Sequence, residues 1–158
     1  MTTGWKWPTF ASSVYYEDPM AAIEWLERAF GFERAMIITD ANGRLAHSQL
    51  SFGDGYVMIG SPWADFINTP GQAGGKNTQM VHIQLETGID ELCERARAAG
   101  AVIMQEPQDQ FYGDRSFRCK DPGGHVWTFG QTTKKMSAAE WDEASGGLKT
   151  TLGPGWRE

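Results

Sequence analysis

The sequence predicts an α+β protein built from two tandem βαβββ modules, whose curved mixed sheets surround a cavity. Two observations carry this prediction. The chain repeats at an offset of 69 residues, which matches Gly31 with Gly100 and Gly55 with Gly124. Each half also shows the same order of patterns, namely a strand, an amphipathic helix that ends at a glycine, and three more strands. Because a half this small buries too little surface alone, the two halves are expected to share one core.

The repeat divides one domain, residues 1–158, into four segments. They are module 1 at about 9–60, a linker at 61–79, module 2 at about 80–131 and a C-terminal tail at 132–158. The linker is rich in Gly, Pro, Asn and Gln, so it is expected to be irregular.

Module 1 begins with a strand at 9–16, which Pro19 ends. Asp18 is the expected N-cap of a helix with Pro19 at its first position, and Gly31 fits the left-handed residue after its last turn. Strands are expected at 32–39, 44–52 and 56–60, with glycine-containing turns between them.

Module 2 repeats this order with a strand at 79–86, a helix at 89–99 and strands at 101–105, 115–120 and 125–130. In the tail, Ser137 and Glu140 have the spacing of a capping box, which predicts a short helix. The glycine-rich end at 146–158 is expected to lie over the surface or over a partner subunit.

Composition narrows the class of partner. The net charge is −6, and no run of Lys or Arg occurs, which argues against nucleic acid or a membrane surface as the partner. No leader-like or membrane-spanning segment is recognisable, so a cytoplasmic protein is the default expectation. The two cysteines, Cys93 and Cys119, lack the spacing of a disulfide framework or a metal site.

Alternation along each strand predicts which side chains face the cavity. In the first strand of module 2, the apolar residues belong under the helix, which leaves His82 and Gln84 on the other face. The offset of 69 then places Tyr15 on the corresponding face of module 1. The same reasoning predicts that the side chains of His47, Gln49 and Arg118 also face the cavity. The last strands are expected to present Val57, Ile59, Val126 and Thr128 there, with His125, Trp127 and Phe129 on the helix side.

Several segments taken together resemble the vicinal oxygen chelate superfamily, which includes glyoxalase I, extradiol dioxygenases, and fosfomycin and bleomycin resistance proteins. They are YYEDPMAAIEWLERAFGFE, LSFGDGYVMIG, IDELCERARAAGA and YGDRSFRCKDPGGHVWTF. The YGDR turn before DPGGHVW is typical of an uncharacterised bacterial branch. The resemblance covers residues 9–131 and implies a shared cavity, but no single reaction.

In metal-dependent members, this resemblance implies ligands on the first and last strand of each module. Those places read Ala11 or Ser13, Ile59, His82 and Thr128 here, so only His82 can ligate. The leading expectation is therefore a protein without a cofactor. The alternative is a divalent metal held by His82 and His47, with a glutamine or Glu17, in an isomerase, lyase or dioxygenase of the glyoxalase type.

The leading interpretation is a small-molecule binding protein of the glyoxalase and bleomycin resistance type. Flanking aromatic residues (Trp63, Phe66, Phe111 and Tyr112) favour an aromatic ligand. A metal-free enzyme with His82 or His47 as general base also stays open, so no catalytic residue is assigned. A homodimer is expected, with cavities formed jointly by both chains. The expected ligand-binding residues are Tyr15, His47, Gln49, His82, Gln84 and Arg118.

Overall fold

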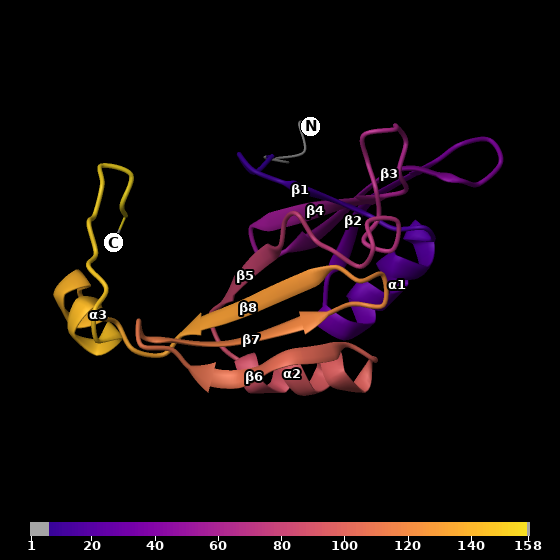
Figure 1. Cartoon of the computed structure of the whole chain (residues 1–158). Coiled ribbons are helices and arrows are strands. Elements are labelled where there is room, and N and C mark those ends of the chain that lie inside the picture. Colours follow the sequence, from indigo (N-terminus) through magenta and orange to yellow (C-terminus); the bar gives the residue numbers. More distant parts are fainter. Residues whose placement is uncertain (1–6, 158) are drawn as a thin grey trace, which may run out of the picture.

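The computed structural model describes residues 7–157 (Figure 1). Each predicted module is present, followed by a third helix. In chain order the elements are β1 (Ser12–Tyr15), α1 (Pro19–Phe30), β2 (Glu33–Thr39), β3 (Leu45–Phe52), β4 (Gly55–Gly60), β5 (Val81–Leu85), α2 (Ile89–Ala98), β6 (Val102–Asp109), β7 (Asp114–Lys120), β8 (Val126–Thr132) and α3 (Ala138–Ser145).

The strands form two separate four-stranded mixed sheets with the same topology. Their orders are β1-β4-β3-β2 and β5-β8-β7-β6. β1 runs parallel to β4 in the first sheet, and β5 runs parallel to β8 in the second. All other neighbouring strands are antiparallel. The predicted α+β class and the repeated βαβββ order are confirmed.

The helix boundaries follow the predicted capping chemistry. Asp18 Oδ1 accepts a hydrogen bond from Ala21 N, Pro19 is the first helical residue, and Gly31 has a φ of 84°. This positive φ favours glycine because it lacks a Cβ. Gly88 takes the corresponding place before α2 without a side-chain cap.

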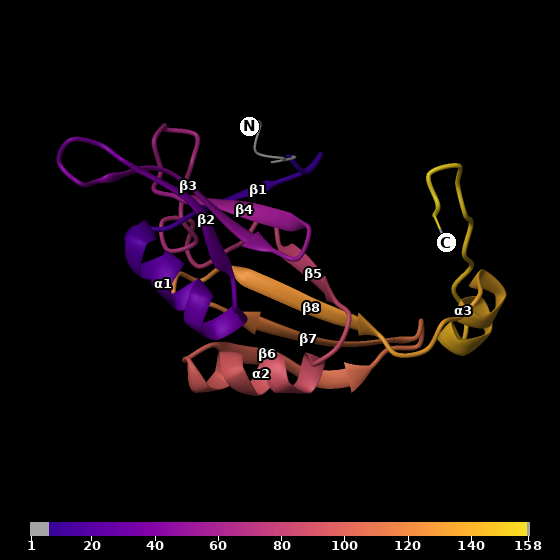
Figure 2. The ribbon, with the colours of Figure 1, turned by 180° about the vertical axis from the view of Figure 1, so that it is seen from behind.

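One core joins the two modules. Helices α1 and α2 pack together, and they lie near each other in both ribbon views (Figures 1 and 2). Phe30 of α1 reaches the sheet of module 2, with ring centroids 5.4 Å from Trp127 and 4.8 Å from Phe129. The helices cover one face of each sheet, and no helix of the described residues packs on the opposite face. We call these the open faces.

The buried carboxylate of Asp121, in the turn between β7 and β8, links the two modules. Asp121 accepts hydrogen bonds from Tyr16 Oη at 2.6 Å, Trp127 Nε1 at 2.9 Å and His125 N at 2.9 Å. Burial, and then the negative charge of Asp121, raises the pKa of the Tyr16 hydroxyl well above its usual value.

His125 lies beside this junction and away from the open face of module 2. Its Nε2 donates a hydrogen bond to the Tyr15 carbonyl oxygen at 2.6 Å, and its ring meets the Tyr16 ring edge-on at 4.7 Å between centroids. Its side chain thus connects the two modules, as expected for a residue on the helix side.

The prediction for β4 was wrong by one residue. Val57 and Ile59 lie in the core, and Met58 pairs with Ser13 where Thr128 pairs with His82. The cause is the turn before the strand. Four residues separate the paired Ser51 and Tyr56, whereas five separate Lys120 and Val126. The offset therefore changes from 69 to 70, and a slip of one residue exchanges the faces of a strand.

The tail contains the predicted short helix, and its capping box is present. Helix α3 and the segment after it stand away from the modules instead of covering their surface (Figure 1). Glu158 lies outside the described residues. Within residues 7–157, no helix combines the length and apolar character needed to cross a membrane.

Candidate ligand-binding site

A row of three polar side chains crosses the open face of module 2. His82 on β5 pairs with Thr128 on β8, and Thr128 pairs in turn with Arg118 on β7. These three residues border a hollow of about 280 Å³. The remaining lining residues are Met80, Val81, Gln105, Gln110, Tyr112 and Ser116.

Arg118 is the cationic group of this hollow. Its Nε donates a hydrogen bond to Thr128 Oγ1 at 3.1 Å, and within residues 7–157 it forms no ion pair. Arg115, on the opposite face of the same strand, is held by Asp90 and Asp109 at 2.9 and 3.2 Å. Arg118 therefore has guanidinium donors left for a ligand, in a hollow whose other polar lining groups are neutral amides and hydroxyls and an imidazole.

His82 is oriented by a chain of hydrogen bonds. Gln84 Nε2 donates to Asp114 Oδ2 at 3.0 Å and to Thr132 Oγ1 at 3.1 Å, which fixes its Oε1 toward His82 Nε2 at 2.9 Å. An amide oxygen only accepts, so Nε2 of His82 is the donor in this contact and Nδ1 points away from Gln84. Gln84 is thus a positioning group for His82.

Glycine at position 130 makes this arrangement possible. A Cβ on Gly130 would lie 2.8 Å from Gln84 Oε1 and 3.2 Å from His82 Cε1. Any larger residue on this part of β8 would displace the amide that orients the imidazole.

The open face of module 1 holds a second polar pair. Gln49 Nε2 lies 3.2 Å from His47 Nε2, and Gln49 is only 1% exposed. Its Oε1 has no hydrogen-bond partner among the described residues. A buried amide oxygen without a partner is costly, so this atom has an unused capacity to accept a hydrogen bond once a donor gains access to it.

Tyr15 borders another hollow, of about 390 Å³, between β1, the linker and the start of β8. Its hydroxyl accepts a hydrogen bond from Trp63 Nε1 at 3.3 Å, and the Trp63 ring meets Phe66 edge-on. Both linker rings are exposed. Tyr112 and Phe111 form a similar edge-on pair beside the hollow of module 2.

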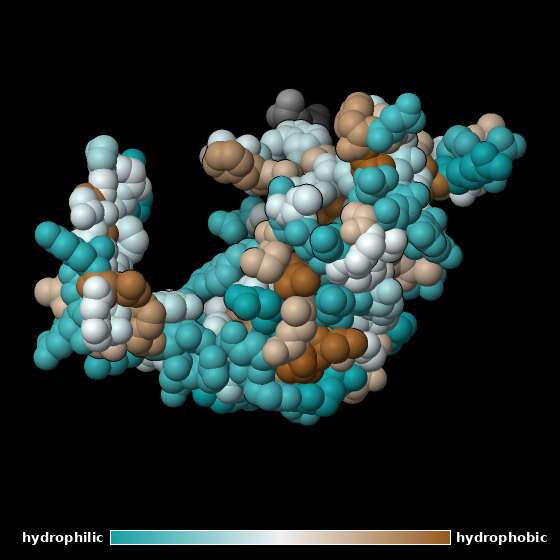
Figure 3. Space-filling model, viewed as in Figure 1, coloured by the Kyte–Doolittle hydropathy of each residue, from teal (hydrophilic) through white to brown (hydrophobic). Residues whose placement is uncertain are grey.

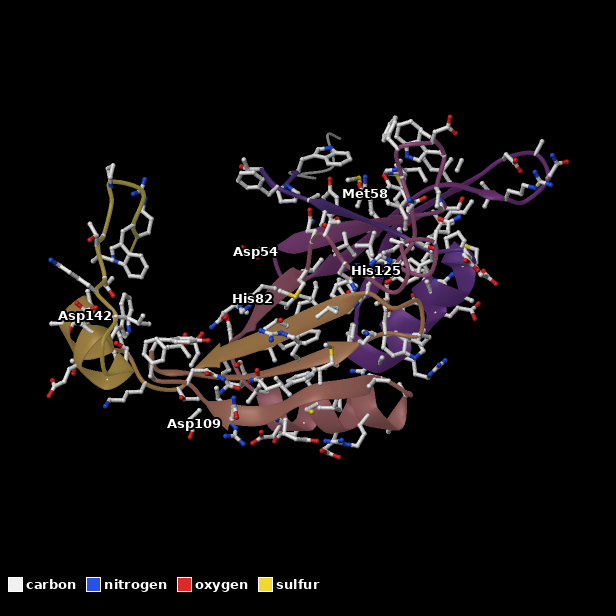
Figure 4. All side chains as sticks on the ribbon, viewed as in Figure 1. Asp54, Met58, His82, Asp109, His125 and Asp142 are labelled. Carbon is white, nitrogen blue, oxygen red and sulfur yellow. The ribbon has the colours of Figure 1, made fainter. Side chains whose placement is uncertain are left out.

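Within one chain, the six predicted site residues fall into two groups. Tyr15, His47 and Gln49 belong to the sheet of module 1, and the other three belong to module 2. Figure 4 shows Met58 and His82, which mark the two open faces, on different sheets. The hollow beside Tyr15 is not lined by His82, Gln84 or Arg118, and the hollow beside Arg118 is not lined by Tyr15, His47 or Gln49.

The residues at the family's ligand positions do not fit a metal. With the β4 register corrected, they are Ser13, Met58, His82 and Thr128. Only His82 is a good ligand, and its Nε2 proton is engaged by Gln84. Residues 7–157 contain no group of three His, Cys, Asp or Glu side chains arranged to hold an ion. The pairing of His82 with His47 is not seen within the chain.

Cys119 is the remaining nucleophile near this site. It is buried on the helix side of β7, and burial raises the pKa of its thiol to about 12. A thiol in this state is a poor nucleophile. Cys119 is therefore a packing residue of the core.

Four residues of the site were missed from the sequence. Gln105 and Gln110 come from a strand that is longer than predicted and interrupted by irregular pairing, so alternation could not place them. Met58 was missed because of the longer turn in module 2. Gly130 had a signal, since a glycine within a strand often marks a close approach of another group.

Comparison with known proteins agrees with this geometry. Residues 9–129 match the Glyoxalase/Bleomycin resistance protein/Dioxygenase superfamily. Among solved structures, TioX from Micromonospora sp. ML1 is 32% identical with a TM-score of 0.65, covering 79% of this chain and 98% of TioX. A superfamily member from Sphaerobacter thermophilus DSM 20745 is 18% identical with a TM-score of 0.62, covering 83% and 99%.

The curated relatives are uncharacterised. A protein of Mycobacterium bovis is 27% identical over 137 residues, covering 84% of this chain and 89% of its own length. A protein of Mycobacterium tuberculosis H37Rv is also 27% identical over 137 residues, and the matched region covers 79% of that protein. The family match, the fold and the repeated modules agree, and the chain belongs to the Glyoxalase/Bleomycin resistance protein/Dioxygenase superfamily, whose fold is that of the vicinal oxygen chelate proteins.

Proposed function

We propose that this protein binds a small organic anion with an aromatic part, and that it does so without a metal ion. The observation that carries the proposal is the free guanidinium of Arg118 on the open face of module 2. A guanidinium binds a carboxylate, sulfonate or phosphate through two parallel hydrogen bonds.

Specificity for an anion follows from the surroundings of Arg118. Gln105 and Gln110 both direct their amide nitrogens to Ser116, so the neighbouring side chains are committed to one another. Asp114, an acid on the same strand as Arg118, is engaged by Gln84. A ligand carboxylate therefore meets the free donors of Arg118 without a competing protein carboxylate in an ion pair.

The aromatic preference rests on exposed rings beside the hollows. Tyr112 lines the hollow of Arg118, and Phe111 packs against it. Exposed aromatic side chains bind planar ligands by stacking and lose little conformational freedom in doing so. A binding protein of this kind sequesters its ligand and needs no acid, base or nucleophile, which fits a site that presents few such groups.

We further propose that the full cavity forms in a homodimer, from module 1 of one chain and module 2 of the other. The two polar groups lie on different sheets of one chain, each on the sheet face opposite the helix of its own module. Pairing two chains would bring the acceptor Gln49 Oε1 opposite the donor Arg118. A ligand with an anionic end and a hydrogen-bond donor would satisfy both.

The test is equilibrium dialysis against pairs of aromatic ligands that differ only in charge, such as benzoate, naphthoate and indole acetate with their amides. We expect Arg118→Gln to weaken carboxylate binding at least tenfold and amide binding little, because a charge-assisted hydrogen bond is worth about 1.5–3 kcal/mol. Arg44→Gln, in an exposed turn of module 1, is the matched control. Equal losses for both ligand types, or no saturable binding in the panel, would reject the proposal.

A further inference from the structure

The C-terminal segment 133–157, which we call the C-terminal arm, projects from the end of module 2. Its helix α3 contains no buried residue. In the space-filling view an open gap separates the arm from the rest of the molecule (Figure 3). An isolated helix of eight residues is unstable in water, because nucleation costs more than so few hydrogen bonds return.

The arm nevertheless has a defined structure and a firm attachment. The backbone nitrogens of Thr133 and Lys134 both donate to the Gly113 oxygen at 2.9 Å, and Trp141 Nε1 donates to the Tyr112 oxygen at 3.1 Å. Within the arm, the Trp141 and Trp156 rings pack edge-on with centroids 5.6 Å apart. The arm is therefore held in one direction by the β6–β7 turn.

The inner side of the arm is apolar and uncovered. Trp141, Leu152 and Trp156 of the arm border a hollow of about 640 Å³, which Tyr112 of the β6–β7 turn also lines. Leu152 and Trp156 are 47% and 48% exposed, and Leu148 nearby is 63% exposed. Apolar side chains gathered in this way mark an interaction surface. Tyr112 also lines the hollow of Arg118, so this surface is continuous with the candidate site.

Charge indicates what covers the arm. The hollow is bordered by Lys134, Lys135 and Arg157 against one acid, Asp114, and the three cations form no ion pair within residues 7–157. Module 1, residues 9–60, has three arginines against seven Asp and Glu, a net charge of −4. Its strand β2 also exposes Met36 and Ile38. A second copy of the chain thus offers a surface of matching polarity and opposite charge.

We infer that the arm of each chain docks on module 1 of a second copy, around β2, and that the two arms are exchanged about a twofold axis. Such an exchange closes on itself and leaves no arm uncovered. It also places Trp141 and Trp156 of one chain beside the open face of the other. The inference does not depend on any ligand being bound.

Hydrogen exchange of the unmodified protein at two concentrations provides the first test. Peptides covering α3 should exchange quickly when the protein is dilute, at nanomolar concentration, and become protected as it reaches tens of micromolar. Peptides from α1 and α2, inside the core, should not change. Protection of α3 that is independent of concentration would overturn the inference, because the arm would then be stable within one chain.

A matched pair of variants provides the second test. Leu152→Asn places an amide in the hollow. Thr151→Asn introduces the same amide at the exposed neighbouring position, which does not border the hollow. Sedimentation over a dilution series should show the dimer of the Leu152→Asn variant weakened at least tenfold, with the Thr151→Asn variant like the parent. Neither change touches the core, so both variants should melt like the parent when monomeric. Equal dimer dissociation constants in all three proteins would overturn the inference.

Discussion

His82 is the side chain on which the interpretations of this site differ most. It occupies a family ligand position, yet its Nε2 donates to Gln84, and Gln84 is held by Asp114 and Thr132. Its partner across the sheet is Thr128, and the two corresponding positions of module 1 hold Ser13 and Met58. A single neutral imidazole with such neighbours is a polar wall residue, since divalent ions need several charged or strongly basic ligands.

We therefore expect His82→Ala to leave the fold intact and to lower the free energy of unfolding by about 1 kcal/mol, the value of one neutral hydrogen bond. The melting temperature of the parent should not change on adding EDTA. Melting curves of parent and variant, with and without EDTA, check both statements. A chelator-dependent melting temperature in the parent that disappears in the variant would establish the metal-dependent alternative.

Gly130 controls the geometry around His82. In Gly130→Ala the new Cβ would approach Gln84 Oε1 to 2.8 Å, so Gln84 must leave its place. Gln84 is an exposed, flexible side chain that can swing away, so we expect a loss of only about 0.5–1.5 kcal/mol in the free energy of unfolding, the value of a lost hydrogen bond. Gly147→Ala, whose Cβ would meet open space, is the control.

The cause can be isolated with a double-mutant cycle measured by urea unfolding. If the clash with Gln84 is responsible, the loss from Gly130→Ala should shrink when Gln84 is also replaced by Ala. Strictly additive losses would show that the strain arises elsewhere.

Sequence reasoning was sufficient to assign side chains to a sheet face on strands with regular alternation. His82, Gln84, His47, Gln49 and Arg118 lie on the open faces as predicted. It was insufficient where one module differs from the other in length, because the repeat then misaligns every residue after the insertion. The burial of Gln49 could not be predicted from the sequence either, because burial depends on which neighbours cover a strand.

At the scale of elements, the junction between the modules is the feature most sensitive to a single group. The Tyr16 hydroxyl comes from the end of β1, whereas its acceptor Asp121 belongs to the turn between β7 and β8. Asp121 also receives the indole of Trp127 from β8. Loss of the Tyr16 proton would place two negative charges side by side in the core, so the folded state keeps this proton.

This junction predicts a dependence of stability on alkaline pH. The pKa of Tyr16 is raised in the folded state, so the unfolded chain releases this proton first, near pH 10. Stability is then fully present below about pH 10 and is lost as the pH rises. The buried thiols of Cys93 and Cys119, with pKa values raised to about 11 and about 12, act in the same direction.

Tyr16→Phe separates the tyrosine from the thiols. The variant should be less stable than the parent at pH 8, because Asp121 loses a donor, but its stability should fall less steeply between pH 9.5 and 11. Urea unfolding at four or five pH values in this range measures both slopes. Identical slopes would show that the junction does not control the alkaline transition.

The element boundaries show which parts of the fold are encoded locally. Helix α1 starts at Pro19 and ends before Gly31 because capping depends on neighbouring residues, and α3 follows its capping box for the same reason. The extension of β6 to Asp109 depends on pairing with β7 across two irregularities. Pairing of this kind is a property of two strands, so a single stretch of sequence does not reveal it.

At the scale of the whole molecule, the two open faces pose one problem. Each sheet is covered by helices on one side only. Its other face keeps hydrogen-bonding capacity that its own module does not use, at Gln49 Oε1 in module 1 and at the guanidinium of Arg118 in module 2. A homodimer would solve this problem twice, by placing module 1 of each chain against module 2 of the other. Light scattering at micromolar concentration should therefore give twice the chain mass of 17.5 kDa.

A mixing experiment can determine whether each cavity is shared between chains. Tyr15→Ala alters module 1 only, and Arg118→Gln alters module 2 only, so each variant homodimer has two defective cavities. In a mixed dimer with shared cavities, one cavity collects both defects, and the other combines an unaltered module 1 with an unaltered module 2. Mixing the two weak binders should thus restore one parent-like site per mixed dimer, measured by dialysis with the ligand found for the parent.

If each cavity belonged to a single chain, every cavity in the mixture would keep one defect and no parent-like binding would return. Binding that stays weak in a mixture whose subunits demonstrably exchange would therefore rule out a shared cavity while leaving the ligand proposal intact.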